Sequence, residues 1–253
     1  MKIFLFTNGH ILGKLILERF QSHQIRVDAV FVEITEKKKN NQKLKHYLMA
    51  KNLIKIPSVI FNLTIELIMR RLSKKHVNTF LDFRYENFTQ KVYRVSDFNS
   101  SQVSNILDDL KPDIIILGGA RIIKKKILLK ANVGFLNAHP GILPFYRGSD
   151  VIYWAYENKD EIGVTVHLVD AGIDTGVILR HKSIENSHSK SIMDLREEAN
   201  HLSAQLLMEV VQDIFTNGQL PTSVESNNNR YPIYRKMGRL SKFRLEKRSE
   251  LHE

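Results

Sequence analysis

Short apolar runs alternate with amphipathic stretches along much of the chain. Residues 2–6 form a run dominated by apolar side chains, which is typical of a buried strand. Residues 27–32 form a second run of this kind. Between them, apolar residues at helical spacing predict a helix, and the resulting strand, helix, strand order is typical of an open parallel sheet. The helical positions are Ile11, Leu15, Ile16 and Phe20.

The middle of the chain continues the alternation. Residues 92–95 are a third strand candidate. Either Ser100 or Ser101 is placed to cap a helix that ends before Pro112, since the residue before a proline disfavours helical geometry. Residues 114–117 are continuously apolar and end in two glycines, a pattern that predicts a central strand entering a functional loop.

A long helix closes this series of elements. Residues 135–137 predict a short strand, and Ser149 is placed to cap a helix through residue 156. Ser191 with Asp194 resembles a capping box in its acidic form, and Gly218 is expected to end the helix that it opens. The helix is predicted by Leu195, Ala199, Leu202, Leu206, Val210 and Ile214, and two more strands by residues 164–168 and 177–179.

Length and composition favour one sizeable α/β domain. The 253 residues and an apolar fraction of 43% supply enough side chains for a continuous core. We expect an open, mostly parallel, twisted sheet flanked by helices over residues 1–218. A basic helical insertion is expected at about residues 37–76, and residues 219–253 form a short C-terminal extension. Because no Gly-x-Gly-x-x-Gly follows the first strand, a nicotinamide site has little support.

The net charge of +11 is concentrated in two stretches. Residues 37–75 hold eleven Lys or Arg against Glu66, and residues 235–248 hold seven against Glu246. Without a recognisable reading motif, this clustering disfavours nucleic acid as a partner. The first stretch also lacks the ~20 mainly apolar residues of a spanning helix. Three interpretations of it remain open: a packed insertion, a homodimer interface, or peripheral contact with an anionic membrane surface.

Residue usage limits the chemistry further. The chain has no cysteine, which excludes disulfides, thiolate nucleophiles and cysteine metal sites. Eight of the ten histidines, all but His139 and His167, show no ligand spacing, and we expect no metal. The first apolar run is too short for the centre of a signal peptide, and we expect a cytoplasmic protein. Because the chain has no cysteine, any catalytic side chain must act through oxygen or nitrogen.

The densest chemical signal lies in residues 134–148. Asn137 and His139 alternate at the end of a strand, so their side chains point to the same side. This run resembles the signature of the folate-dependent formyltransferases, Asn-x-His followed by Leu-Pro-x-Tyr-Arg-Gly. Residues 163–176 continue the match, and they include the position of the family's acidic catalytic residue, here Asp174. Gly141 departs from the serine of many relatives, which leaves the three catalytic positions unaffected.

The resemblance covers about residues 112–180, is weaker over the first 35 residues, and implies a Rossmann-like formyltransferase fold. It also implies that Asn137, His139 and Asp174 are catalytic. The chemistry agrees, because amine attack on a formyl amide creates a negative oxygen that needs hydrogen-bond donors. We expect Asn137 and His139 to supply these donors. His139 and Asp174 would share the proton transfers, with no metal and no covalent intermediate required.

By resemblance, the formyl donor is 10-formyltetrahydrofolate, held between two glycine-containing loops. His167 is left open between a structural histidine and a substrate contact. Arg147 is left open between bracing its loop through a carboxylate and binding ligand. The predicted cofactor-binding residues are Gly119, Ala120, Arg121, Ile122, Asp170, Gly172 and Ile173, and the predicted substrate-binding residues are Asn8, Gly9, His10, Tyr146, Arg147 and Gly148.

The amine that accepts the formyl group is predicted by excluding the acceptors of other members of the family. Methionyl-tRNA formyltransferases carry a further C-terminal barrel, for which the residues after Gly218 are too few. Glycinamide ribonucleotide formyltransferases have a Gly/Ser/Asn-rich phosphate loop, of which residues 7–11 are a poor copy. We therefore expect a nucleotide-linked deoxyamino sugar, as in polysaccharide biosynthesis. The alternatives are another small amine, such as a purine precursor or a hydroxylamine, a non-catalytic folate-binding protein, or a nucleic-acid-binding protein.

Overall fold

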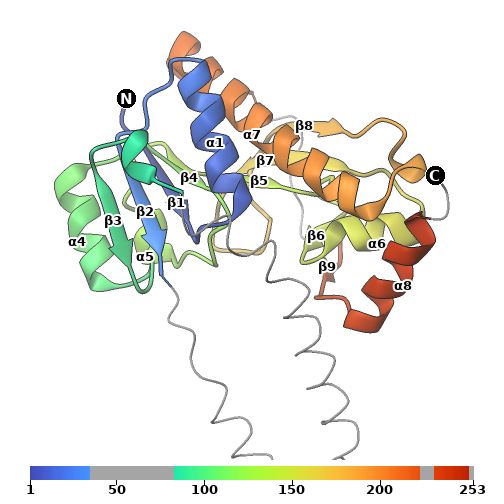
Figure 1. The fold of residues 1–253 in the computed structure, drawn as a ribbon. Helices are drawn as coiled ribbons and strands as arrows, with labels where there is room; N and C mark the ends of the chain where they lie inside the picture. The colour runs from blue at the N-terminus through green and yellow to red at the C-terminus, as the bar shows by residue number, and fades with distance from the viewer. Residues whose placement is uncertain (35–82, 223–230, 251–253) are drawn as a thin grey trace, which may run out of the picture. The chain divides into compact units, whose positions relative to one another are not determined.

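The protein is described by a computed structural model that covers residues 1–34, 83–222 and 231–250 (Figure 1). The elements below belong to the compact unit formed by residues 1–34 and 85–253, and the predicted insertion at 37–76 lies outside the described residues. The strands are β1 (Ile3–Thr7), β2 (Ala29–Glu33), β3 (Val92–Val95), β4 (Ile114–Leu117), β5 (Gly134–His139), β6 (Arg147–Gly148), β7 (Gly163–Leu168), β8 (Ile178–Ser183) and β9 (Ile233–Tyr234). The helices are α1 (Ile11–Ser22), η3 (Tyr85–Asn87), α4 (Ser101–Leu110), α5 (Lys125–Leu128), α6 (Val151–Asn158), η4 (Ser187–Ser189), α7 (Ile192–Asn217) and α8 (Arg239–Glu250).

Seven strands form the main sheet in the order β3-β2-β1-β4-β5-β7-β8. The first five in this order pair in parallel, whereas β7 is antiparallel to both β5 and β8. The prediction of an open, mostly parallel α/β sheet is therefore confirmed. The chain order reverses at β1, which lies between β2 and β4, and ligands of open α/β sheets bind beyond the carboxyl ends of the strands at such a point.

Helices cover both faces of the sheet. On one face, an aromatic cluster fills the space below α4 and α5, where the Phe6 ring stacks on Phe98 with 4.6 Å between centroids and lies 4.9 Å from Phe31. Such aromatic contacts add to the free energy gained by burying apolar area. On the other face, α1 and α7 pack against each other and α7 reaches β5 and β7 (Figure 1). The strands are thus held rigidly between two apolar layers.

The predicted ends of two helices are confirmed. Ser100 is the N-cap of α4, and its hydroxyl accepts a hydrogen bond from the Val103 amide at 3.3 Å. Ser191 caps α7 by accepting from the Asp194 amide at 3.2 Å. Gly218 ends α7 in the left-handed region with φ of 69°, a conformation that glycine adopts without a steric penalty. The six apolar positions predicted for this helix are all buried.

Several strand ends differ from the prediction by one or two residues, and two other boundaries differ for a structural reason. Ser149 does not cap α6; it lies one residue before the N-cap, and its amide donates to the Tyr234 carbonyl beside the β6–β9 pair. The N-cap is Asp150, whose carboxylate accepts from the Met237 amide at 2.9 Å and pairs with Lys242 at 2.6 Å. Strand β8 continues to residue 183, past the predicted end at 179, since an edge strand can carry polar residues on its exposed side.

We expect Ser100→Ala to lower the free energy of unfolding by about 1 kcal/mol, because it leaves an amide of the first turn of α4 without its cap. Ser101→Ala is the matched control, since Ser101 is the exposed first residue of the helix and is expected to change stability by less than ~0.5 kcal/mol. Chemical denaturation of the two variants measures the difference. Equal effects would show that the cap does not contribute.

Candidate active site

Strand β5 carries the two predicted donors beyond the edge of its neighbour. Leu117, the last residue of β4, pairs with Asn137, so His139 lies two residues further along β5. Alternation places both side chains on the same face of the sheet. His139 is only 4% exposed, which removes its imidazole from bulk water. The end of β5 therefore presents a side-chain amide and a buried imidazole side by side, as predicted.

His167 of β7 lies directly opposite Asn137 in the antiparallel pair. The His167 Nδ1 and the Leu168 carbonyl oxygen are 2.9 Å apart, and because a carbonyl only accepts, Nδ1 carries the proton. In the neutral ring, Nε2 is then free to accept from Asn137 Nδ2, which lies 3.1 Å away. This contact fixes the orientation of the amide. A β-bulge next to Val166 interrupts the β7–β8 register at this point, a feature common beside functional sites.

Burial keeps His167 neutral. Its side chain is 2% exposed, and this desolvation, helped by the nearby His139, lowers the pKa of His167 to about 4, although Asp174 acts in the opposite direction. At neutral pH the ring is therefore an acceptor for Asn137. The sequence left the role of His167 open. The register of β5 against β7 sets His167 opposite Asn137 and makes it the hydrogen-bond partner of that amide.

Asp174 approaches both histidines from the loop after β7. Its Oδ2 lies 3.6 Å from His139 Nδ1, and its Oδ1 lies 3.8 Å from His167 Nε2. Oδ2 also accepts from the Gly148 amide at 2.8 Å. Asp174 has φ of 50°, and a non-glycine residue held in this region is a feature that clusters at active sites. The three predicted catalytic side chains and His167 thus form one connected group.

The tautomer of His139 follows from its other neighbour. His139 Nε2 lies 2.7 Å from the Tyr146 carbonyl oxygen, which can only accept, so Nε2 carries a proton. The nitrogen that gains or loses a proton is therefore Nδ1, which faces Asp174. The pair is arranged to move a proton at one defined atom.

The loop that carries Asp174 is braced from both sides. A Cβ on Gly176 would lie 1.6 Å from the Leu168 carbonyl oxygen, so that position does not accommodate a side chain, and a Cβ on Gly172 would lie 2.0 Å from Thr175 Oγ1 and displace that hydroxyl. Arg147 is 3% exposed and donates from Nε and Nη2 to the Ile173 carbonyl at 3.0 and 2.9 Å. Arg147 therefore braces the loop through a carbonyl rather than through the carboxylate that was one prediction.

Two further predicted groups meet at the ends of β1 and β4. Gly119 has φ of +86°, and a Cβ there would lie 2.7 Å from His10 Cβ and 3.3 Å from Asn8 Oδ1. The Thr7 hydroxyl donates to the Gly118 carbonyl at 2.8 Å, which ties the two loops together. The predicted substrate residues at 8–10 and the predicted cofactor residues at 119–122 are thus neighbours. Their roles stay predictions.

The remaining predicted substrate residues, Tyr146 and Gly148, contact the catalytic group through their main-chain atoms. Tyr146 is buried, its hydroxyl donates to the Asp160 carboxylate, and its ring stacks on Tyr234 at 5.0 Å between centroids. Burial, reinforced by Asp160, raises the pKa of Tyr146. Gly148 has φ of +101°, and a Cβ there would lie 2.3 Å from the Tyr234 carbonyl oxygen. Contact of these residues with a substrate stays a prediction.

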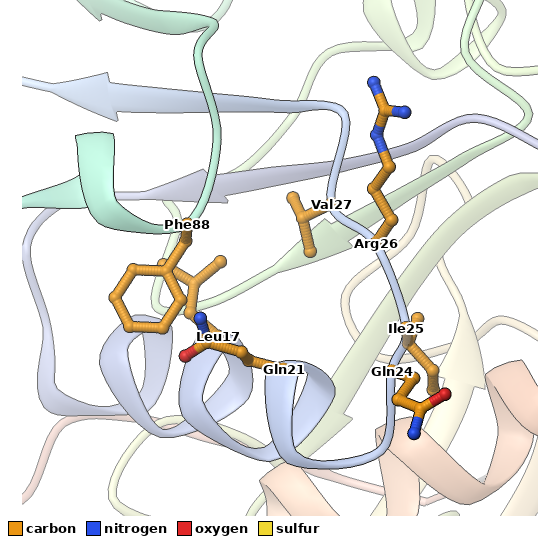
Figure 2. A pocket seen from close by; sticks show the side chains of 7 residues that line it. All are labelled: Leu17, Gln21, Gln24, Ile25, Arg26, Val27 and Phe88. Atoms are coloured by element: carbon orange, nitrogen blue, oxygen red, sulfur yellow. The ribbon is translucent and has the colours of Figure 1, made fainter.

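A separate hollow lies near the amino edge of the sheet, where α1 ends and β2 begins. Figure 2 shows that it contains no residue of the predicted site. Over the described ranges, no set of three His, Asp or Glu side chains is arranged to hold a metal ion, and no helix is long and apolar enough to span a membrane. The hollow is lined by Leu17, Gln21, Gln24, Ile25, Arg26, Val27 and Phe88.

Comparison with known proteins identifies the family. The family model described as "Formyl transferase" matches residues 1–211. The chain belongs to this formyl transferase family. Among curated relatives, a family member from Finegoldia magna, a methionyl-tRNA formyltransferase, is 34% identical over 119 residues, which cover 46% of this chain and 38% of that protein. The chain spans less than half the length of the curated relatives that it matches.

Solved structures show the same family fold. A sugar N-formyltransferase from a Shewanella species has a TM-score of 0.58 at 16% identity and covers 98% of this chain and 87% of its own. A phosphoribosylglycinamide formyltransferase from Bacillus halodurans has the same TM-score and identity, and the alignment covers 87% of this chain and 97% of that protein. An N-formyltransferase from Helicobacter canadensis was solved with folinic acid and dTDP-3-aminofucose. It has a TM-score of 0.56 at 18% identity, and the alignment covers 92% of this chain and 70% of that protein. The formyl transferase fold is thus shared by proteins that differ in acceptor.

We expect the His167 imidazole to stay neutral, with its proton on Nδ1, down to a pH of about 4. A folded-state pKa below the unfolded value of ~6.5 means that this group destabilises the fold as the pH falls from 6.5 towards 4. NMR titration of the ring nitrogens tests this, with His167→Phe identifying the resonance. His139→Ala should raise the pKa of His167, and a titration near 6.5 in the unaltered protein would contradict the assigned environment.

Proposed function

We propose that the protein transfers the formyl group of 10-formyltetrahydrofolate to the amine of a nucleotide-linked deoxyamino sugar. The observation that carries the proposal is the group of Asn137, His139, His167 and Asp174. The hydrogen bonds of Asn137, His139 and His167 have determined directions, and the Asp174 carboxylate lies 3.6 Å from His139 Nδ1. A formyl amide needs donors for a developing negative oxygen and a group that moves protons. This group offers both within a few ångströms.

The donors for that oxygen come from Asn137 and His139. One N–H of Asn137 Nδ2 is directed to His167 Nε2, so the second N–H is the one available to substrate. A protonated His139 offers its Nδ1–H, while its Nε2–H stays on the Tyr146 carbonyl. Because the two donors are held before substrate arrives, little reorganisation accompanies the reaction. Such preorganised donors are among the largest contributions to catalysis.

The proton balance uses His139 and Asp174. The acceptor nitrogen forms a bond to the formyl carbon, and the C–N10 bond of the folate breaks as the adduct collapses. The new nitrogen must lose a proton and N10 must gain one, so one proton crosses the site. Asp174 faces Nδ1 of His139 at 3.6 Å, which places an acid and a base next to each other for this transfer.

The proposed substrates rest on proteins of this fold. The Helicobacter canadensis enzyme was solved with a folate and a nucleotide-linked amino sugar, and the Shewanella sugar N-formyltransferase aligns over nearly the whole of this chain. Methionyl-tRNA is the second candidate acceptor, because the curated relatives of higher sequence identity are methionyl-tRNA formyltransferases. The same catalytic group would serve either amine.

The acceptor is tested by incubating the protein with 10-formyltetrahydrofolate and three acceptor classes in parallel. These are a panel of nucleotide-linked amino sugars, charged methionyl-tRNA and glycinamide ribonucleotide. Product mass and folate absorbance report transfer. We expect a mass gain of one formyl group on an amino sugar. Transfer to another acceptor alone would replace the proposed substrate, and no transfer to any amine would contradict the proposed activity.

We expect Asn137→Ala, His139→Ala and Asp174→Asn each to reduce turnover by ~100 to 1,000-fold, because each removes a group that acts in the transition state. Circular dichroism and thermal unfolding should remain close to those of the unaltered protein. His181→Ala is a matched control, since His181 is an exposed histidine of β8. Near-normal turnover in any two of the three variants would reject the assignment.

We also expect full activity after exhaustive chelation, because the proton transfers and the oxyanion contacts are assigned to side chains. Turnover measured before and after chelator treatment checks this. Activity that returned only on adding zinc or magnesium would show that another group takes part.

A further inference from the structure

Tyr146 meets the candidate active site through its main chain, while its side chain is held elsewhere. Its carbonyl oxygen lies 2.7 Å from His139 Nε2 and accepts the hydrogen bond of that nitrogen. A Cβ on Gly141 would lie 2.9 Å from this oxygen and 3.0 Å from Nε2, so the contact is closely enclosed. Whatever fixes the Tyr146 carbonyl therefore also fixes which nitrogen of His139 faces Asp174.

The Tyr146 side chain is anchored at its hydroxyl by two residues at the end of α6 and just beyond it. The hydroxyl donates to the Asp160 carboxylate and accepts from Asn158 Nδ2 at 2.9 Å. The ring is 4% exposed and stacks on Tyr234 with 12° between the two planes. The side chain is therefore restrained along its whole length. We name Asp160 and Asn158 the hydroxyl clamp.

Asp160 is itself held through its main chain. Lys159, the C-cap of α6, has φ of 58°, and this left-handed residue turns the chain as the helix ends. The Asp160 amide donates to the Ala155 carbonyl at 3.0 Å. The Asp160 carbonyl accepts from His188 Nε2 at 2.9 Å. The acceptor for the Tyr146 hydroxyl is thus fixed by α6 and by η4.

The peptide that carries the carbonyl lies between two anchored side chains. On one side is Tyr146, whose hydroxyl is held by the hydroxyl clamp. On the other side is Arg147, which is buried and donates to the Ile173 carbonyl. Rotation of this peptide would turn the carbonyl away from His139, and both anchors oppose that rotation.

We infer that Asp160 is a positioning residue for formyl transfer, acting on His139 through Tyr146. The inference rests on the proposed function, in which His139 moves a proton at Nδ1. With the hydroxyl clamp in place, the carbonyl keeps a proton on Nε2, and Nδ1 faces Asp174 at 3.6 Å. Without it, the carbonyl is less restrained, and the neutral ring also populates the tautomer with its proton on Nδ1. In that tautomer Nδ1 cannot act as the base.

The tautomer of His139 is measured by nitrogen NMR on the full chain without substrate, at a pH where the ring is neutral. His139→Ala identifies the resonances. We expect the unaltered protein to carry the proton on Nε2. Asp160→Ala should shift the ring resonances towards a mixture of the two tautomers, and the Nε2 proton should exchange faster with water. Tyr146→Phe should cause the same shift, and it keeps the buried ring on which the fold depends.

Turnover gives a second readout. We expect Asp160→Ala to lower kcat about tenfold, as for the loss of one hydrogen bond to a charged group, with little change in KM. Asp160→Asn keeps an oxygen that accepts from the Tyr146 hydroxyl and should restore most of the activity. Combining Asp160→Ala with Tyr146→Phe should lower kcat no further than either change alone.

Glu157→Gln is the matched control. It removes another carboxylate from the same end of α6, one that pairs with Arg248 at 3.0 Å on the surface. Because this carboxylate is not part of the hydroxyl clamp, the variant should leave both kcat and the His139 resonances unaltered. Each variant is first compared with the unaltered protein by circular dichroism.

Any of three results would overturn the inference. The first is an unaltered His139 tautomer in Asp160→Ala, which would show that the hydroxyl clamp does not reach the imidazole. The second is an equal loss of turnover in Asp160→Asn or in Glu157→Gln, which would assign the effect to charge. The third is additive losses from Asp160→Ala and Tyr146→Phe. Absence of transfer to any amine rejects the proposed function instead, and the NMR comparison then decides the inference alone.

Discussion

The hydrogen bond between Asn137 and His167 across β5 and β7 is the contact on which the rest of the site depends. An unrestrained side-chain amide can present either its oxygen or its nitrogen to a substrate. His167 removes this freedom, because Leu168 takes the proton of Nδ1 and burial keeps Nε2 unprotonated. The amide must then direct its nitrogen to the imidazole. Its second N–H is left in a determined position, which the stabilisation of a negative oxygen requires.

The sheet makes this contact possible. An antiparallel strand next to β5 sets Asn137 opposite His167, whereas a one-residue slip of β7 would turn His167 to the opposite face. His139 is oriented by the same logic, through a backbone carbonyl two residues before the glycine whose amide holds Asp174. Main-chain atoms of a neighbouring segment thus position His139 and Asp174 directly, and they position Asn137 through His167, whose Nδ1 is bound by the Leu168 carbonyl. Rigid elements, more than long side chains, determine the geometry.

Much of this could be predicted from the sequence, because periodicity and local caps depend on residues close together in the chain. Such local patterns predict the parallel strands and the start and end of α7. They also predict that Asn137 and His139 lie on the same face of the sheet. The partners across strands do not. Three contacts join segments between 26 and 87 residues apart: the acceptor for Asn137, the carbonyl that holds Arg147, and the Met237 amide that binds Asp150, the N-cap observed in place of Ser149. No spacing rule within one segment encodes them.

The central claim is that His167 acts through Asn137, and a double-mutant cycle on turnover tests it most directly. His167→Phe keeps a ring of similar size and removes the acceptor, so it should slow turnover while the fold persists. If His167 works by orienting the amide, adding His167→Phe to Asn137→Ala should cause little further loss, and the two effects should be strongly non-additive. Independent, additive losses in the double variant would contradict the account and assign His167 a role of its own.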